Sequence, residues 1–328
     1  MFRDSISHNN ITRNVLCGLI FTVCLFVLSC GKRNSTHNYD PTTSTTSTDN
    51  TTTSIGLFVA VGTTGTILTS PVGRTWTSRT SETLNHLQGN TYANSTFVTV
   101  GDNGTILTSS DGTTWTSRTS GTSNDLRGVT YGNELFVIVG YSGTILTSSD
   151  GSTWTSRTSG TSNILLGVTY GNGTFVTVGY SGTILTSSNG VTWTQRTSGI
   201  SEQLRGITYG NGLFVTVGTS GTILTSSNGT SWTQRTSGTS EILRGVTYGN
   251  ELYVIVGYSG TILTSSDGST WTSRTSGTSN ILLGVTYGNG TFVTVGYSGT
   301  ILTSSNGTSW TSRTSGTSDH FLGVTYSQ

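Results

Sequence analysis

Most of the chain alternates short apolar runs with polar, glycine-rich turns. In one example, the apolar pair Ile145 and Leu146 is followed by Thr and Ser, then by Asp150-Gly151, and strand-forming residues resume at Trp154. An Asp at a turn can bond the backbone through its side chain, and a Gly adopts positive φ without steric cost. The pattern therefore predicts two short β-strands joined as a hairpin.

The same hairpin recurs along the chain at a fixed period of 39 residues. Each copy carries one tryptophan, and these are all the tryptophans of the chain: Trp76, Trp115, Trp154, Trp193, Trp232, Trp271 and Trp310. A fixed period of this length, built from strands, indicates a repeat architecture.

One repeat, taken as a specimen, divides into four short strands. We predict strand A at 165–170, strand B at 174–179, strand C at 183–188 and strand D at 192–197, with Gly, Asn and Ser in the turns between them. Four antiparallel strands in about 40 residues are typical of one blade of a β-propeller.

The two ends of the repeat region complement each other. The first repeat has strands B, C and D at 57–61, 66–70 and 75–80 but no strand A, whereas residues 321–326 form a strand A with nothing after it. A C-terminal strand that completes blade one closes the ring and removes its free edges. The glycine of strand A occurs seven times, at Gly89, Gly128, Gly167, Gly206, Gly245, Gly284 and Gly323. We therefore predict an all-β fold, a closed seven-bladed β-propeller with four antiparallel strands per blade. An open β-solenoid is the alternative.

Composition narrows the classes of partner. Charged residues make up 9% of the chain, the formal net charge is +1, and Lys32 is its one lysine, so there is no electrostatic footprint for nucleic acid. The cysteines Cys17, Cys24 and Cys30 all precede the repeats, and the four histidines do not fall at ligand spacing. We expect neither a metal site nor a cofactor in the repeat region.

The N-terminal 30 residues have the pattern of an export signal, with a basic start followed by an apolar run that is too short to span a membrane. The sequence VLSCG around Cys30 resembles the lipobox of bacterial lipoproteins, which implies lipidation of Cys30 and a membrane anchor through this lipid. An ordinary signal peptide or a short uncleaved anchor is the alternative. Residues 31–54 are rich in Thr and Ser and are predicted to be a flexible tether, followed by the propeller at 55–328.

The hairpin resembles the Asp-box, or BNR, repeat, whose pattern is S-x-D-x-G-x-T-W. Ser148, Asp150, Gly151, Thr153 and Trp154 supply these residue types, with one residue fewer between Asp and Trp. Similar repeats build the propellers of sialidases and of the photosystem II assembly-factor family, and the longer unit GVTYGN-GxFVTVG-xxGTILTSSDG-xTW is more similar to the latter. The resemblance covers essentially all of 55–328 and implies a propeller fold.

The turn residues, tryptophans and arginines that recur in the repeats are interpreted as structural. The acidic turn position is Asp at Asp111, Asp150 and Asp267 and Asn at Asn189, Asn228 and Asn306, and this exchange favours a structural turn over a catalytic carboxylate. Each tryptophan is interpreted as a wedge between blades, with a sugar-stacking platform as the alternative. An arginine follows each tryptophan three residues later, and we expect its stem to pack on the next blade and its head to be exposed. A ring of anion-binding arginines is the alternative.

Residues that differ between repeats cluster at one end of the predicted blades, where D–A and B–C connections meet. The candidate binding residues there are Arg127, Arg205, Arg244, Tyr141, Tyr180, Tyr258 and Tyr297. Arginine and tyrosine are enriched among binding hot spots. Neutral variation in loops is the alternative explanation.

Near-identity of the blades argues against an enzyme. Residues 131–190 and 248–307 differ only at Phe136 and Tyr253, whereas a catalytic centre needs different groups around one pocket. The leading hypothesis is a non-enzymatic, lipid-anchored scaffold in a bacterial cell envelope, at the outer membrane or cell surface and facing the periplasm or exterior. Its expected partner is a protein or a glycan. The alternatives are a multivalent carbohydrate-binding propeller and, third, a glycosidase-like enzyme.

Overall fold

The computed structural model describes residues 56–327. The predicted signal peptide at 1–30, its lipidation site Cys30 and the tether at 31–54 lie outside the described residues. Among residues 56–327, no helix is long and apolar enough to cross a membrane.

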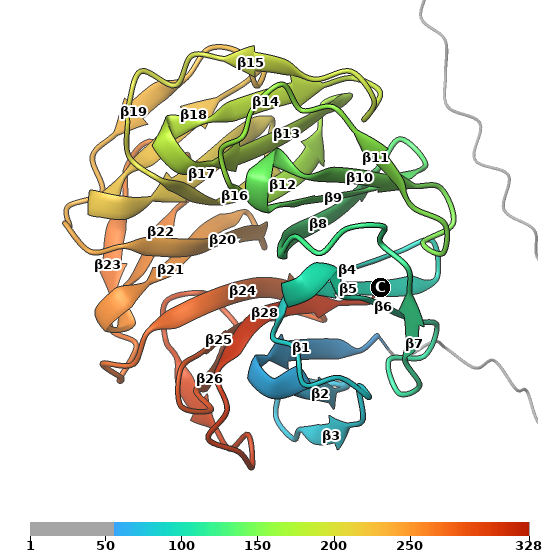
Figure 1. Ribbon diagram of the computed structural model, residues 1–328. Helices are drawn as coiled ribbons and strands as arrows, with labels where there is room; N and C mark the ends of the chain where they lie inside the picture. Colours follow the sequence, from blue (N-terminus) through green and yellow to red (C-terminus); the bar gives the residue numbers. More distant parts are fainter. Residues whose placement is uncertain (1–55, 328) are drawn as a thin grey trace, which may run out of the picture. The chain divides into compact units, whose positions relative to one another are not determined.

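The described chain forms seven four-stranded antiparallel sheets arranged as blades around a ring (Figure 1). From strand A to strand D, the blades consist of these strands: blade one, β28 (Phe321–Tyr326), β1 (Phe58–Gly62), β2 (Ile67–Ser70) and β3 (Thr77–Arg79); blade two, β4 (Leu87–Ala93), β5 (Thr96–Gly101), β6 (Ile106–Ser109) and β7 (Thr116–Arg118); blade three, β8 (Leu126–Gly132), β9 (Leu135–Gly140), β10 (Ile145–Ser148) and β11 (Thr155–Arg157); blade four, β12 (Leu165–Gly171), β13 (Thr174–Gly179), β14 (Ile184–Ser187) and β15 (Thr194–Arg196); blade five, β16 (Leu204–Gly210), β17 (Leu213–Gly218), β18 (Ile223–Ser226) and β19 (Thr233–Arg235); blade six, β20 (Leu243–Gly249), β21 (Leu252–Gly257), β22 (Ile262–Ser265) and β23 (Thr272–Arg274); blade seven, β24 (Leu282–Gly288), β25 (Thr291–Gly296), β26 (Ile301–Ser304) and β27 (Thr311–Arg313).

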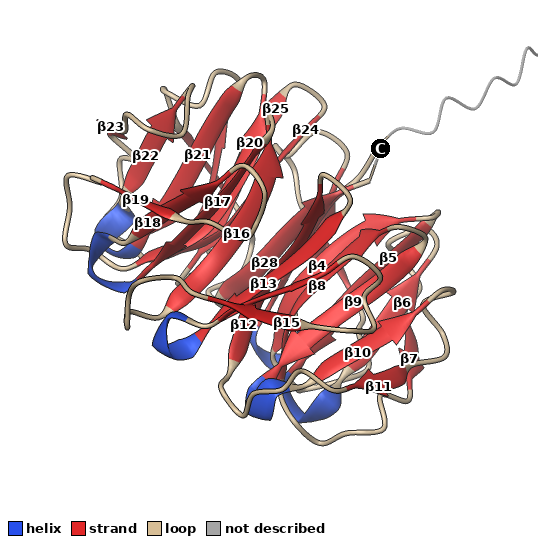
Figure 2. Cartoon of the chain, turned by 90° about the horizontal axis from the view of Figure 1, so that it is seen from above, coloured by secondary structure: helices blue, strands red, loops and turns tan. Residues whose placement is uncertain are grey.

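Short 3-10 turns join strands B and C in blades one to six: η1 (Thr63–Gly65), η2 (Asp102–Gly104), η3 (Tyr141–Gly143), η4 (Tyr180–Gly182), η5 (Thr219–Gly221) and η6 (Tyr258–Gly260). Figure 2 shows these turns together on one face of the ring. The D–A connections reach the same face, because adjacent strands run antiparallel. We call this face the axial-pocket face, since the cavity described below opens among its turns.

The predicted closure of the ring is confirmed. Strand β28 pairs antiparallel with β1, with Phe58 opposite Tyr326 and Val61 opposite Gly323, so the last strand of the chain completes the first blade. Leu57 and Ser327 are also joined by two hydrogen bonds, from Leu57 N to Ser327 Oγ (2.7 Å) and from Ser327 N to Leu57 O (2.9 Å). The seven-bladed fold class predicted from the repeats is therefore correct.

Strand D is shorter than predicted. In blade four it spans Thr194–Arg196 instead of 192–197, because Trp193 belongs to the turn, where its Nε1 donates to Gly190 O at 3.1 Å. The polar contacts of the turn hold residues 189–192 out of the ladder. Asn189 Oδ1 accepts hydrogen bonds from the backbone N–H groups of Val191 (2.9 Å) and Thr192 (3.0 Å).

Aspartate makes the same turn in other blades. Asp150 Oδ1 accepts from Ser152 N (2.8 Å) and Thr153 N (3.0 Å), and Oδ2 accepts from Ser152 Oγ (2.6 Å). These bonds, led by the one from the Ser152 hydroxyl, hold the pKa of Asp150 below its usual value. Asp and Asn are thus interchangeable as acceptors here, which supports the prediction of a structural turn.

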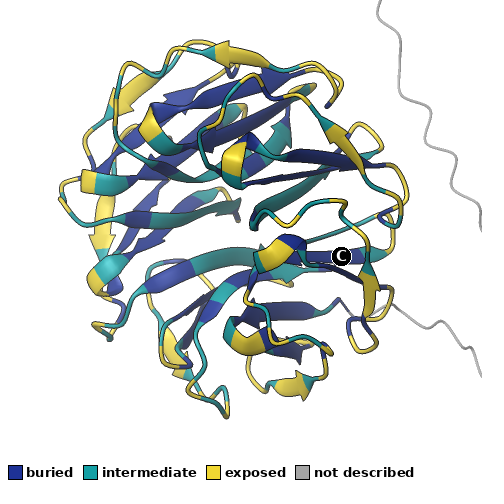
Figure 3. Cartoon of the chain, in the orientation of Figure 1, coloured by how far each residue is buried: buried dark blue, intermediate teal, exposed yellow. Residues whose placement is uncertain are grey.

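The hydrophobic core lies between the blades, where strands B and C are buried (Figure 3). One of seven such clusters joins Val137, Val139 and Ile145 of blade three to a set of blade-four residues that includes Phe175. Trp193 packs against this cluster, with its ring centroid 6.4 Å from that of Phe175. The tryptophans therefore lie at the blade interfaces, as predicted.

The repeated arginines differ in one respect from the prediction. Each Nε donates to a threonine Oγ1 on strand C of its own blade, as Arg196 does to Thr186 at 2.8 Å. The same bond, at 2.8–2.9 Å, occurs at Arg79, Arg118, Arg157, Arg235, Arg274 and Arg313. These side chains are half-buried, so the guanidinium group ties strand D to strand C and is not a free head.

Candidate binding site at the ring axis

Every strand A contains a β-bulge at its second residue. In blade five, Leu204 is opposite Gly218 and Gly206 is opposite Val217, so Arg205 is the extra residue between them. Blades two to four, six and seven shift register at the same position, and β28 skips Leu322 in the same way. A bulge leaves one residue unpaired and re-aims its side chain.

The bulge residues of all seven blades line one cavity of about 210 Å³, together with two tyrosines of the B–C turns. Strand A is the innermost strand of each blade (Figure 1), so a cavity that draws on all seven lies at the ring axis. Its lining residues are Gln88, Arg127, Leu166, Arg205, Arg244, Leu283, Leu322, Tyr141 and Tyr180. We call this cavity the axial pocket.

The glycine after each bulge residue permits the close approach of neighbouring strands. A Cβ atom on Gly206 would lie 2.4 Å from the carbonyl oxygen of Arg244, so a side chain there would displace the next strand. This spacing brings Arg205 and Arg244, on adjacent blades, into one small volume.

Arg127 is paired with carboxylates. Its Nη2 lies 3.0 Å from Asp125 Oδ2 and 3.7 Å from Asp102 Oδ1, and its Cζ lies 4.6 Å from the centroid of the Tyr141 ring. Asp102 Oδ1 also accepts from Gln88 Nε2 at 2.8 Å. The positive charge of Arg127 is therefore neutralised locally.

Arg205 and Arg244, in contrast to Arg127, are not paired with carboxylates of the described residues. Arg205 Nη2 donates to the neutral Gln203 Oε1 at 2.8 Å. Within residues 56–327, no carboxylate lies within 4.0 Å of either guanidinium group. The Nε atom of Arg205 is also buried without an acceptor in this part of the chain, as is that of Arg127.

The pKa of Arg244 is lowered by its surroundings in the pocket. Burial, followed by the positive charge of Arg205, lowers it to about 10, and Arg127 acts in the same direction. Tyr258 and Tyr297 oppose the shift. Arg244 remains charged at neutral pH, but at a cost in free energy.

Five of the seven predicted binding residues line the axial pocket: Arg127, Arg205, Arg244, Tyr141 and Tyr180. Tyr258 and Tyr297 do not line it. Tyr297 instead stacks on His320, with ring centroids 4.2 Å apart and an interplanar angle of 11°. Gln88, Leu166, Leu283 and Leu322 were not predicted as site residues, although they occupy the same position of the repeat as the three arginines.

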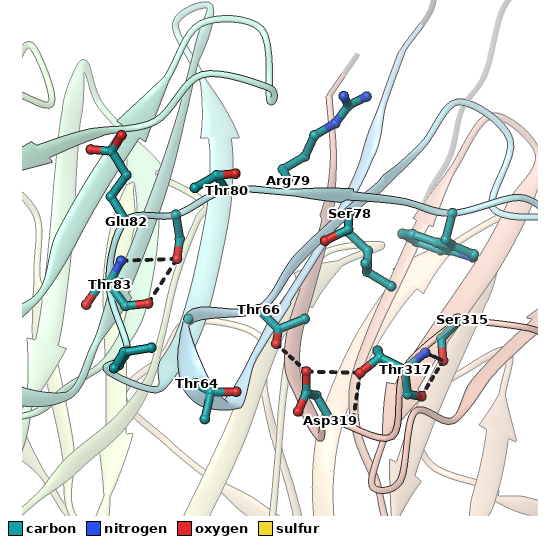
Figure 4. Close-up of a pocket in the computed structure, with 16 residues that line it drawn as sticks. Thr64, Thr66, Ser78, Arg79, Thr80, Glu82, Thr83, Ser315, Thr317 and Asp319 are labelled. Carbon is teal, nitrogen blue, oxygen red and sulfur yellow. Dashed lines mark hydrogen bonds between the residues drawn. The ribbon is translucent and has the colours of Figure 1, made fainter.

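Larger grooves lie between consecutive blades, away from the axis. One, of about 730 Å³, is lined by Trp76 and Ser78 of blade one and by the connection from blade seven to β28 (Figure 4). Asp319 in that connection accepts hydrogen bonds from Thr66 Oγ1 (2.7 Å) and Thr317 Oγ1 (3.0 Å). A second groove, of about 530 Å³, is lined by Trp115, Arg118 and Ser and Thr residues. Each of these two grooves is built from one blade and its neighbouring connection, whereas the axial pocket draws on all seven blades.

The comparisons with known proteins establish the fold. No protein-family model matches the chain, and no curated protein matches it. Among solved structures, YCF48 bound to D1 peptide aligns with a TM-score of 0.57 and 20% identity, over 70% of this chain and 80% of that one. YCF48 from Cyanidioschyzon merolae aligns with a TM-score of 0.55 and 17% identity, over 70% and 85%. The computationally designed protein Ika8 aligns with a TM-score of 0.59 and 13% identity, over 80% and 92%. At these identities, the chain shares a fold with the three proteins.

Proposed function

We propose that this chain is a non-enzymatic interaction module that binds a protein partner through its axial-pocket face and is held in the cell envelope by a lipid on Cys30. One observation carries the proposal. The side chains that break the repeat, including three arginines and two tyrosines, converge on a single cavity at the ring axis. Arginine and tyrosine combine large contact area with directed polar groups, as in binding hot spots.

The two ends of the described residues support a binding site on the axial-pocket face. Strand A runs away from the axial-pocket face, so β28 ends on the opposite face, where Ser327 is bonded to Leu57. Residues 56 and 327, the two ends of the described chain, therefore both lie on the face opposite the axial pocket. The structure of YCF48 bound to D1 peptide is a precedent for a peptide ligand on a similar fold.

Site-specific photo-crosslinking tests the proposal. A photoreactive amino acid is placed at Tyr180, on the axial-pocket face, or at Asn189, in a C–D turn on the opposite face, and the full chain is irradiated in its native cells. We expect a discrete protein adduct from position 180 that is lost in Arg205→Leu, and none from position 189. Adducts from both positions, or from position 189 alone, would move the interface away from the axial pocket.

A second candidate is multivalent carbohydrate binding in the grooves between blades. The observation that favours it is that two of these grooves combine a tryptophan, an arginine and hydroxyl groups, at Trp76 with Arg79 and at Trp115 with Arg118. A glycan-binding screen with the full chain tests it. Saturation at several equivalent ligands per chain, and loss of one ligand equivalent in Trp76→Phe with an unchanged melting temperature, would support this second function over the first.

A further inference from the structure

The arginines of the axial pocket are not required by the fold. The bulge position holds Arg at Arg127, Arg205 and Arg244, but Leu at Leu166, Leu283 and Leu322. All six residues occupy the same β-bulge in the same strand of nearly identical blades. An uncharged side chain therefore satisfies the structural demands of the position, and the arginines need another explanation.

The charges of the pocket do not balance. Arg127 is matched by Asp125 and Asp102, whereas Arg205 and Arg244 have no carboxylate within 4.0 Å in the described part of the chain. Arg244 also donates no hydrogen bond to another described residue, and burial and Arg205 lower its pKa to about 10. Two positive charges thus share a confined space with unused hydrogen-bond donors, an arrangement that an anion stabilises.

We propose that the axial pocket binds a compact oxyanion with two negative charges, held by Arg205 and Arg244. Two unmatched guanidinium groups set the charge, and the volume of about 210 Å³ limits the ligand to a small group. Guanidinium groups recognise phosphate and carboxylate oxygens through directed, charge-assisted hydrogen bonds. Tyr141 and Tyr180 also line the pocket. The inference goes beyond the proposed function, because it requires no protein partner.

Isothermal titration calorimetry on the full chain tests the inference, with inorganic phosphate, succinate and acetate as separate probes at low ionic strength and pH 7.5. Phosphate and succinate represent the two chemical sources of a doubly charged oxyanion, and acetate is the singly charged control. We expect saturable one-to-one binding of phosphate or succinate and much weaker binding of acetate. Equal binding of acetate, or no saturable binding of any probe, would overturn the proposal.

The variants Arg205→Leu and Arg244→Leu locate the site. Each introduces the residue that the chain already uses at the equivalent position of other blades, so folding should be preserved, as circular dichroism can verify. Each loss of a charge-assisted hydrogen bond should weaken binding about 10- to 100-fold. Arg74→Gln is the matched control, because Arg74 is exposed in a C–D turn on the opposite face. Unchanged affinity in both leucine variants, or an equal loss in Arg74→Gln, would show that the arginines of the axial pocket do not hold the anion.

The calorimetry tests the anion site and the crosslinking experiment tests the protein partner, so either proposal can be contradicted without the other. Anion binding by purified protein, without a crosslinked partner at position 180, would support the pocket and contradict the proposed protein-binding function. A partner adduct at position 180 without anion binding would support the function and contradict the pocket.

Discussion

Replacement of Phe321 by alanine tests how the ring is closed. Phe321 begins β28, the last strand of the chain, and is fully buried in the core between blades seven and one, with Phe58, Val295 and Ile301. If β28 is an integral part of blade one, Phe321→Ala leaves a cavity at an interface on which ring closure depends. If the strand were a loosely attached end, the same change would cost little.

The expected magnitude follows from burial. A Phe→Ala change at a fully buried site costs about 3–5 kcal/mol, since lost transfer free energy and cavity formation add. For a domain of this size, that loss lowers the melting temperature by about 6 to 20 °C. Phe321→Leu should cost about 1 kcal/mol, because strand A starts with leucine in the other six blades.

Urea denaturation followed by tryptophan fluorescence measures these differences, since every blade interface carries a tryptophan. Thr325→Ala in the same strand is the control: Thr325 is half-buried opposite Val59, and its replacement should cost less than about 1 kcal/mol. A Phe321→Ala protein that unfolds at the same urea concentration as Thr325→Ala would refute the closure of the ring by β28.

Three further changes probe the turn, the pocket and the anchor. Asp150→Asn should lower the melting temperature at neutral pH slightly, since Asn keeps the two backbone bonds that Asn189 also accepts but loses the bond from Ser152 Oγ to Oδ2, whereas Asp150→Ala should lower it further in a thermal melt. The folded-state pKa of Asp150 lies below its unfolded value, so the stability that the ionised Asp150 adds to the fold is present above pH about 4 and is lost as pH falls through the folded-state pKa. Asp150→Asn should therefore make the melting temperature less sensitive to acid, and an unchanged dependence of the melting temperature on pH would contradict this role of Asp150. Arg244→Leu should raise the free energy of unfolding by up to about 3 kcal/mol at low salt, because it removes a guanidinium group whose pKa is lowered to about 10 by burial. If urea denaturation showed the variant to be less stable, the charge of Arg244 would be compensated by its surroundings. Cys30→Ala should abolish lipid labelling of the chain, and unchanged labelling with a radioactive fatty acid would rule out the lipoprotein anchor.

Much of the fold could be predicted from sequence because the information is local and repeated. Each hairpin is specified by a turn of Asp or Asn with Gly between short β-branched runs, and the 39-residue period repeats this unit. The complementary half-repeats at the two ends predicted closure, since one strand A was missing at the start and one was left over at the end. The residue exchange at Asp150 and Asn189 similarly predicted a structural turn, which depends on contacts within four residues.

The candidate site was only partly predictable. Variation between repeats identified Arg127, Arg205 and Arg244, because a residue that breaks a repeat is visible in the sequence alone. The sequence also grouped Tyr258 and Tyr297 with them, yet neither tyrosine lines the pocket. Tyr297 instead stacks on His320, which lies in the connection just before β28. Which turn side chains reach the axis depends on neighbours from the adjacent blade, and these neighbours are distant in sequence.

Tertiary structure alone decided that the bulge residues meet. A β-bulge re-aims one side chain per blade, but only ring closure places seven such side chains around one axis, and only the absence of a Cβ on Gly206 lets the strand carrying Arg244 approach so closely. The sequence thus determined the hairpin, its period and the number of blades, because these follow from short-range backbone preferences and hydrophobic patterning. The ring determined the axial pocket and its unbalanced charge, because electrostatic coupling between Arg205 and Arg244 arises from separation in space and not from separation along the chain.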